Sequence, residues 1–106
     1  MKQDDFLWLQ QWYYAHCDGD WEHSRRIHLG TLDNPGWSLT VNLRDTELED
    51  KEFQEITLER SDNDWVICMV EDGNFEGRCG AENLPEVLKI FHDWTENCKD
   101  MADPNV

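Results

Sequence analysis

Residues 26–43 read RIHLGTLDNPGWSLTVNL, and this stretch decides the fold class. Apolar and polar residues alternate along 37–43, which is the period-two pattern of an antiparallel strand with one buried face. A shorter alternation along 26–32 predicts a partner strand. Between them, NPGW at 34–37 fits a type II turn, because Pro occupies its second position and Gly its third. The stretch therefore predicts a β-hairpin.

Three further strands are expected downstream of the hairpin. Residues 56–59 alternate between apolar and polar, whereas 65–70 are continuously apolar, as in a central strand covered on both faces or nearly so. Residues 75–79 include a glycine and predict a weaker fifth strand at an edge of the sheet. The acidic segment 45–55 has no clear period and predicts a loop, with Phe53 tucked beneath it.

A helix is expected on each side of these strands. The first begins after Asp4 or Asp5, which can cap it, and ends before Gly19. Residues on one side of this helix at helical spacing are Trp8, Leu9, Trp12, Tyr13 and His16. The second begins at Asn83, with Glu86 completing a capping box. Its apolar stripe comprises Leu84, Val87, Leu88, Phe91, Trp94 and Cys98.

These elements predict an α+β fold in one domain spanning 1–106. The expected architecture is an antiparallel β-meander of about five strands, flanked by an N-terminal and a C-terminal helix that pack on one face. The tail at about 100–106 is expected to be frayed.

The charge balance restricts the kind of partner. The chain has 24 acidic and 9 basic residues, for a formal net charge of −15, and acids dominate the stretch 45–64. Such a field repels nucleic acid and anionic membranes and speeds association with a basic protein. We therefore expect neither a nucleic-acid nor a membrane partner.

Cysteine usage and the N-terminus indicate a cytoplasmic protein. The first residues lack the apolar core of a signal peptide, and no apolar run reaches transmembrane length. The cysteines at 17, 68, 79 and 98 form no CxxC pair. Reduced thiols in the cytoplasm are the simplest interpretation.

Two other classes of protein stay open as alternatives. His16, Cys17, His23 and His28 suggest a metal-stabilised structural module. Zinc ligands, however, are usually paired at spacings of two to four residues, and only the adjacent His16 and Cys17 are close. Cys79 before a helix suggests a small sulfurtransferase, because a helix N-terminus lowers a thiol pKa, although Glu82 would repel an anionic sulfur. No common catalytic or nucleotide-binding motif is present. We expect no cofactor, no metal and no catalytic residue.

Carboxylates gather in the predicted loops and at strand ends, beside tryptophans. The candidate partner-binding residues are Asp18, Asp20, Trp21, Glu22, Asp33, Glu47, Glu49 and Asp50. Tryptophan anchors amid carboxylates suit an interface with a basic protein. The alternative is a solvated acidic surface above core tryptophans.

Several motifs are similar to a known family. They are WLQQWY at 8–13, CDGDWEH at 17–23, TLDNPGWS at 31–38, DTELE at 45–49, NDW at 63–65, FEG at 75–77 and a closing helix with Phe91 and Trp94. In these the chain resembles the immunity protein 53 family of bacterial polymorphic-toxin systems. The resemblance implies a cytoplasmic, non-catalytic protein that binds and neutralises a cognate toxin encoded nearby. It carries over no toxin-contacting residue.

The resemblance and the charge lead to one hypothesis. The acidic loops would occlude the toxin's active cleft stoichiometrically, and a basic nuclease is the kind of toxin that such a charge suits. The sequence leaves the oligomeric state open.

Overall fold

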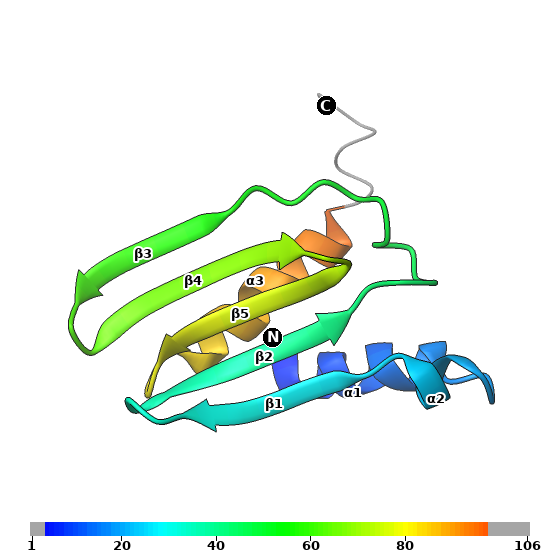
Figure 1. Ribbon diagram of the computed structural model, residues 1–106, viewed down its shortest axis with the longest axis horizontal. Helices are drawn as coiled ribbons and strands as arrows, with labels where there is room; N and C mark the ends of the chain where they lie inside the picture. Colours follow the sequence, from blue (N-terminus) through cyan, green and yellow to red (C-terminus); the bar gives the residue numbers. More distant parts are fainter. Residues whose placement is uncertain (1–3, 98–106) are drawn as a thin grey trace.

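The computed structural model describes residues 4–97. Its elements, in chain order, are α1 (Asp5–His16), α2 (Trp21–Ser24), β1 (Ile27–Leu32), β2 (Gly36–Asn42), β3 (Ile56–Ser61), β4 (Asp64–Glu71), β5 (Asn74–Gly80) and α3 (Leu84–Glu96). The strands form one antiparallel sheet in the order β1-β2-β5-β4-β3, and α1 and α3 cover the same face of it (Figure 1). The expected α+β fold is therefore confirmed. The predicted frayed tail at 100–106 lies outside the described residues.

The β1–β2 hairpin forms as predicted, but its turn is built differently. The strands pair from Ile27 opposite Val41 to Leu32 opposite Gly36. Gly36 does not have the positive φ that the third position of a type II turn requires, so that prediction is wrong. A Cβ atom on Gly36 would lie 2.3 Å from the carbonyl oxygen of Cys79 in β5. Gly36 therefore permits two strands to approach closely.

The strand order departs from a simple meander. The β2 strand pairs with β5, and the segment 43–55 carries the chain across to β3 at the far edge. The β5 strand is therefore in the middle of the sheet, and the prediction that 75–79 forms an edge is wrong. A Cβ atom on Gly77 would lie 2.6 Å from Cγ1 of Val87 in α3. The glycine in this strand marks a close helix contact rather than an edge.

The β4 strand is an interior strand, but only one of its faces is covered by a helix. Val66 and Cys68 are fully buried. Trp65 and Ile67 point to the opposite face, because side chains alternate along a strand, and they are only partly buried. Within residues 4–97 no helix lies on that face (Figure 1). The β4 strand is thus interior to the sheet, as predicted, and the prediction of two covered or nearly covered faces holds fully for one face and only in part for the other.

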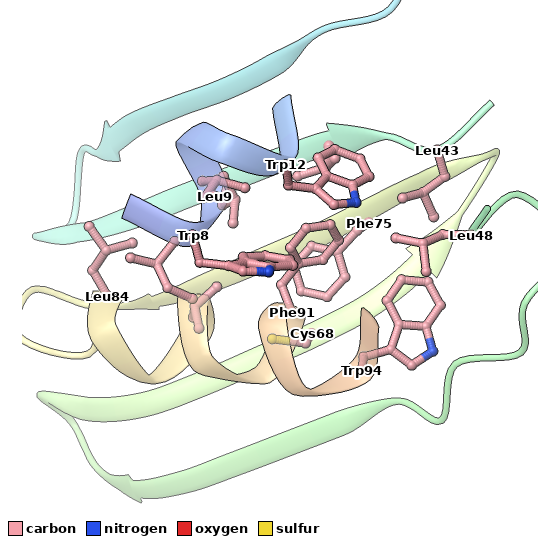
Figure 2. Close-up of a cluster of buried hydrophobic side chains, with 14 of the residues drawn as sticks. Trp8, Leu9, Trp12, Leu43, Leu48, Cys68, Phe75, Leu84, Phe91 and Trp94 are labelled. Carbon is pink, nitrogen blue, oxygen red and sulfur yellow. The ribbon is translucent and has the colours of Figure 1, made fainter. Parts of the chain in front are cut away.

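The core lies between the sheet and the two long helices, and aromatic rings dominate it (Figure 2). Trp8 and Trp12 of α1 meet Phe91 of α3 edge-on, with ring centroids 5.8 and 5.5 Å apart. Phe91 also packs on Phe75 of β5, at 4.9 Å. Such pairs contribute about 0.5–1.5 kcal/mol each beyond the buried area. They join α1, α3 and the sheet into one unit.

The helices begin where predicted, with one different cap. Asp4 caps α1 by accepting a hydrogen bond from a backbone amide two residues on, at 3.0 Å. Asn83 makes no side-chain cap bond on α3. Its side-chain amide donates instead to Asp64 and Glu86, and Arg60 donates to the same two carboxylates, whose pKa values it lowers. The predicted capping box is therefore wrong, and its residues join the β3–β4 hairpin to α3.

The segment 43–55 is a loop, as predicted, and buried side chains anchor it. Phe53 packs against the rings of Phe75 and Trp94, with centroids 5.5 and 5.1 Å apart. Leu48 is fully buried, a position that the acidic pattern around it had hidden. The loop is thus fixed to the core at two points although it contains no helix or strand.

Candidate acidic binding surface

One end of the sheet gathers most of the predicted partner-binding carboxylates. The α1–α2 connection, the 43–55 loop and the β4–β5 turn all lie there (Figure 1). The Trp21 indole N–H donates to the Arg44 carbonyl oxygen at 3.1 Å, and the Leu43 amide donates to the Gly73 carbonyl oxygen at 2.8 Å. We call this end of the molecule the acidic end. Its carboxylates are those of the α1–α2 connection with Glu22, of residues 45–50 and of the β4–β5 turn: Asp18, Asp20, Glu22, Asp45, Glu47, Glu49, Asp50, Glu71 and Asp72.

Asp18 and Glu22 hold together the connection between α1 and the short helix α2. Oδ1 of Asp18 accepts hydrogen bonds from the amides of Asp20 and Trp21, both at 2.9 Å. In return, the Glu22 carboxylate accepts from the amides of Asp18 and Gly19 at 3.0 and 2.9 Å. The amides of Trp21 and Asp20 lower the pKa of Asp18. This reciprocal pairing produces α2, a single helical turn that the sequence analysis did not predict.

The structure places Trp21 in the core. Its side chain is only 5% exposed, and its ring packs edge-on against the rings of Trp12 and Tyr13. The Trp37 ring is partly buried, and its indole N–H donates to the Ala81 carbonyl oxygen at 3.0 Å. Trp21 thus supports the acidic end from beneath instead of standing beside the carboxylates on the surface, whereas Trp37 follows the β1–β2 turn at the opposite end of the sheet.

Glu47 joins the acidic loop to α1. Its Oε2 accepts from the Trp12 indole N–H at 2.9 Å, and its Oε1 lies 2.9 Å from Nε2 of His16. Burial alone would raise the pKa of Glu47, but the hydrogen bonds from Trp12, from its own backbone and from His16 together lower it. The carboxylate therefore stays ionised and points into a fixed environment.

The remaining candidates divide into two places. Asp20, Glu49 and Asp50 are exposed at the acidic end, and the carboxylates of Asp20 and Asp50 accept no hydrogen bond from residues 4–97. Asp33 is also exposed, but it lies in the β1–β2 turn at the opposite end of the sheet (Figure 1). The strand between them spans roughly 20 Å at about 3.3 Å per residue. The structure therefore brings together all the candidate carboxylates except Asp33.

A groove between α1 and β1 is a feature that sequence reasoning missed. It encloses about 770 Å³, and we call it the α1–β1 groove. Its lining is Asp4, Phe6, Leu7, Leu9, Gln10, Tyr13, Glu22, His23, Arg25, Arg26, Ile27 and His28. Phe6 and Leu7 are each 48% exposed, and Tyr13, predicted for the apolar side of α1, is 38% exposed. The sequence signal that could have indicated this groove is the position of Phe6 and Leu7 outside the buried stripe of the helix.

The two alternative functions meet obstacles in the structure. Cys79 lies within β5 and is 1% exposed, and burial raises its thiol pKa, whereas sulfur transfer needs an accessible thiolate. Across residues 4–97, no three His, Cys, Asp or Glu side chains are arranged to hold a metal ion. Cys17, Cys68 and Cys79 are free thiols, and Cys98 lies outside the described residues.

None of the helices between residues 4 and 97 combines the length and apolar character needed to cross a membrane.

Comparison with known protein families identifies the family of this chain. No curated protein matches the chain, and no solved structure matches it. The family model described as Immunity protein 53 matches residues 6–96, a range that includes all of α3, all of α1 except its first residue, all five strands and the whole acidic end. The chain therefore belongs to the immunity protein 53 family.

Proposed function

We propose that this protein binds a cognate bacterial toxin and neutralises it by stoichiometric occlusion, with the acidic end seated over a basic active cleft. Membership of the immunity protein 53 family makes it an immunity protein for a polymorphic toxin. The mode of binding is our proposal, as are the cytoplasmic location and the identification of the toxin as a basic nuclease.

The observation that carries the proposal is the exposure of carboxylates on anchored segments at one end of the molecule. Asp20, Glu49 and Asp50 face solvent, while Glu47 and the buried Leu48 fix the loop to α1 and the core. The net charge of −15 adds a long-range field that speeds encounter with a basic surface. A carboxylate array of this kind can occupy the positions that substrate phosphates take in a nuclease cleft.

Charge reversal at matched positions tests the proposal. Asp20, Asp50 and Glu71 are exposed at the acidic end, and their carboxylates make no hydrogen bond or ion pair within residues 4–97. The triple variant Asp20→Lys/Asp50→Lys/Glu71→Lys therefore changes charge without removing a structural contact. Control positions with the same properties lie at the opposite end of the sheet, at Asp33, Asp62 and Glu82.

The probe is a polymorphic-toxin domain encoded next to the gene for this chain. Stopped-flow mixing of the purified domain with the protein measures association, and co-expression of the two measures protection of the cell. We expect the acidic-end triple to slow association by roughly 10- to 1,000-fold and to lose protection of the cell. The control triple, with the same change in net charge, should keep protection. Equal effects of the two triples would overturn the placement of the interface. A wild-type chain that neither binds nor protects would overturn the function.

Occlusion also has a stoichiometric signature. Titration of toxin activity with the protein should reach complete inhibition at a fixed molar ratio. Complete loss of toxin activity at a substoichiometric amount of the protein, with no recovery after the protein is removed, would indicate a catalytic mechanism instead.

A further inference from the structure

We infer that the free edge of β1, together with the α1–β1 groove, is a second docking surface, which takes an extended segment of the toxin as a sixth strand. The segment would carry apolar side chains at alternate positions and a carboxylate near Arg26. This inference rests on the proposed function, because it assumes the toxin as partner, and it concerns a surface separate from the exposed carboxylates of the acidic end.

The backbone of β1 is set for strand addition. The Asn42 amide donates to the Arg26 carbonyl oxygen at 3.0 Å, so these residues form a hydrogen-bonded pair. Such pairs alternate along an antiparallel ladder. In the β1–β2 register, the backbone groups of Ile27, Leu29 and Thr31 must therefore point away from β2. Since β1 is the first strand of the sheet, they meet no other strand.

The side chains of the same residues share the face of β1 on which the groove lies. Ile27 lines it directly and Leu29, 40% exposed, lies on the same face two positions along β1. The other wall belongs to α1, where Phe6 and Leu7 are half exposed. In Figure 1, α1 lies behind β1 on the face that it shares with α3. An added strand would therefore bury its alternate side chains against apolar groups that are now open to water.

The charge at this surface favours a toxin segment that carries a carboxylate. The Arg26 side chain is exposed and makes no hydrogen bond or ion pair within residues 4–97, whereas the neighbouring Arg25 side chain pairs with Asp45. The groove's two carboxylates are already engaged: Asp4 caps α1, and Glu22 binds backbone amides. An approaching carboxylate would thus meet an unpaired guanidinium. A second copy of the chain is disfavoured as occupant, because each copy carries a net charge of −15.

The other edge of the sheet lacks these properties. The register of β3 shifts between Glu59 and Ser61, and such irregularities protect an edge from further pairing. Glu59 and Arg60 add exposed charges to this strand. The β1 strand is regular in its pairing from Ile27 to Leu32, and it contains no acidic residue.

Residue-resolved hydrogen exchange provides the direct test. The full chain would be measured alone and with the toxin domain used above, inactivated at its catalytic residue. Strand addition predicts that the amides of Ile27, Leu29 and Thr31 gain at least roughly tenfold protection. The amides of His28 and Gly30, which already bond to β2, should change much less. The alternation distinguishes a paired strand from simple shielding of the groove.

Two variants test the surface by affinity. Thr31→Pro removes one outward amide while sparing the bonds to β2, as an edge strand tolerates, and should weaken toxin binding roughly tenfold. Thr31→Ala keeps the amide and is the matched control. Relative to the wild type, Arg26→Glu alone should weaken toxin binding roughly tenfold, and Arg26→Gln should weaken it less. If Thr31→Pro unfolds the chain, the two Arg26 variants and the hydrogen-exchange pattern still test the docking surface.

The outcomes separate the two proposals. Binding of toxin to the wild-type chain without protection of the three amides overturns the edge inference and leaves the proposed function standing. Failure of the wild-type chain to bind toxin overturns the function itself. Protection of these amides in the isolated chain, either constant or rising with its concentration, would assign the edge to the chain's own tail or to a second copy. Either result overturns the inference.

Discussion

Apolar side chains are buried at the acidic end of the molecule but remain partly exposed in the α1–β1 groove. At the acidic end, Leu48 is fully buried and Trp21 is 5% exposed, so charge faces outward from a solid support. In the groove, Phe6 and Leu7 remain half exposed although a core lies beside them. Removal of an apolar anchor should therefore destabilise the first region, and removal of apolar side chains from the second should affect binding rather than folding.

The largest expected difference is in the stability lost when Leu48 or Leu7 is replaced by alanine. Leu48→Ala should lower the free energy of unfolding by about 2–5 kcal/mol, because it leaves a cavity beneath the acidic loop. Leu7→Ala removes the same atoms from a side chain that is 48% exposed, and should change stability by less than about 0.5 kcal/mol. Urea denaturation measures both. Similar losses would mean that the groove is part of the structural core.

Two glycines give a second contrast. Gly77→Ala places a Cβ atom 2.6 Å from the stiff Val87 side chain and should destabilise by about 1–3 kcal/mol, with partial rescue by Val87→Ala. Gly30 of β1 has no atom within 4 Å of such a Cβ and no positive φ, so Gly30→Ala should stabilise by about 0.4–1 kcal/mol. Thermal unfolding of the three variants is the measurement. Equal effects at the two glycines would contradict the packing of α3 on β5.

The third contrast depends on pH. Folding lowers the pKa of Glu47, so its stabilisation is fully present above the ordinary carboxyl pKa of roughly 4.3 and is lost as pH falls through the lowered value. Glu47→Gln should therefore destabilise by about 1 kcal/mol at neutral pH and progressively less below pH roughly 4.3. Asp50→Asn is the control, since this carboxylate accepts no hydrogen bond within residues 4–97.

Low pH weakens the repulsion among the carboxylates of this acidic chain and so changes the stability of every variant. Comparison of each variant with the wild type at the same pH subtracts this general effect. A difference between Glu47→Gln and the wild type that grows towards low pH would contradict the structural role of this carboxylate.

The smallest effect concerns neighbouring arginines. Arg25 pairs with Asp45 at 3.1 Å on the surface, so Arg25→Gln should destabilise by about 0.2–1 kcal/mol, an effect that added salt reduces. Arg26→Gln should leave stability within about 0.5 kcal/mol. A clear loss of stability in Arg26→Gln would show that this guanidinium has a partner within the fold and is not available for docking.

Local sequence signals predicted the elements that depend on local physics. The alternation over 37–43 and the cap at Asp4 each involve neighbours within a few residues, and both were confirmed. Gly36 and Gly77 were misinterpreted, because each faces a strand or helix distant in the sequence. Similarly, Trp21 lies beneath the acidic residues that surround it in the chain, and only the contact with α1 shows this.

The candidate site was predictable in part, for the same reason. Acidic composition indicated the carboxylates, and the fold then collected two distant segments at one end while leaving Asp33 at the other. The α1–β1 groove depends on the placement of an edge strand against the outer side of a helix. The sequence around Phe6 and Leu7 does not indicate which strand lies opposite these two side chains.

The anchoring of the 43–55 loop also bears on the entropy of binding. A loop without helix or strand is ordinarily free to move, and a partner that orders it must overcome about 1–2 kcal/mol for each residue fixed. Here Leu48 and Phe53 hold the loop to the core, and Glu47 holds it to α1. Folding has already ordered the backbone that carries the carboxylates of this loop, so more of the electrostatic attraction to a partner is retained as affinity.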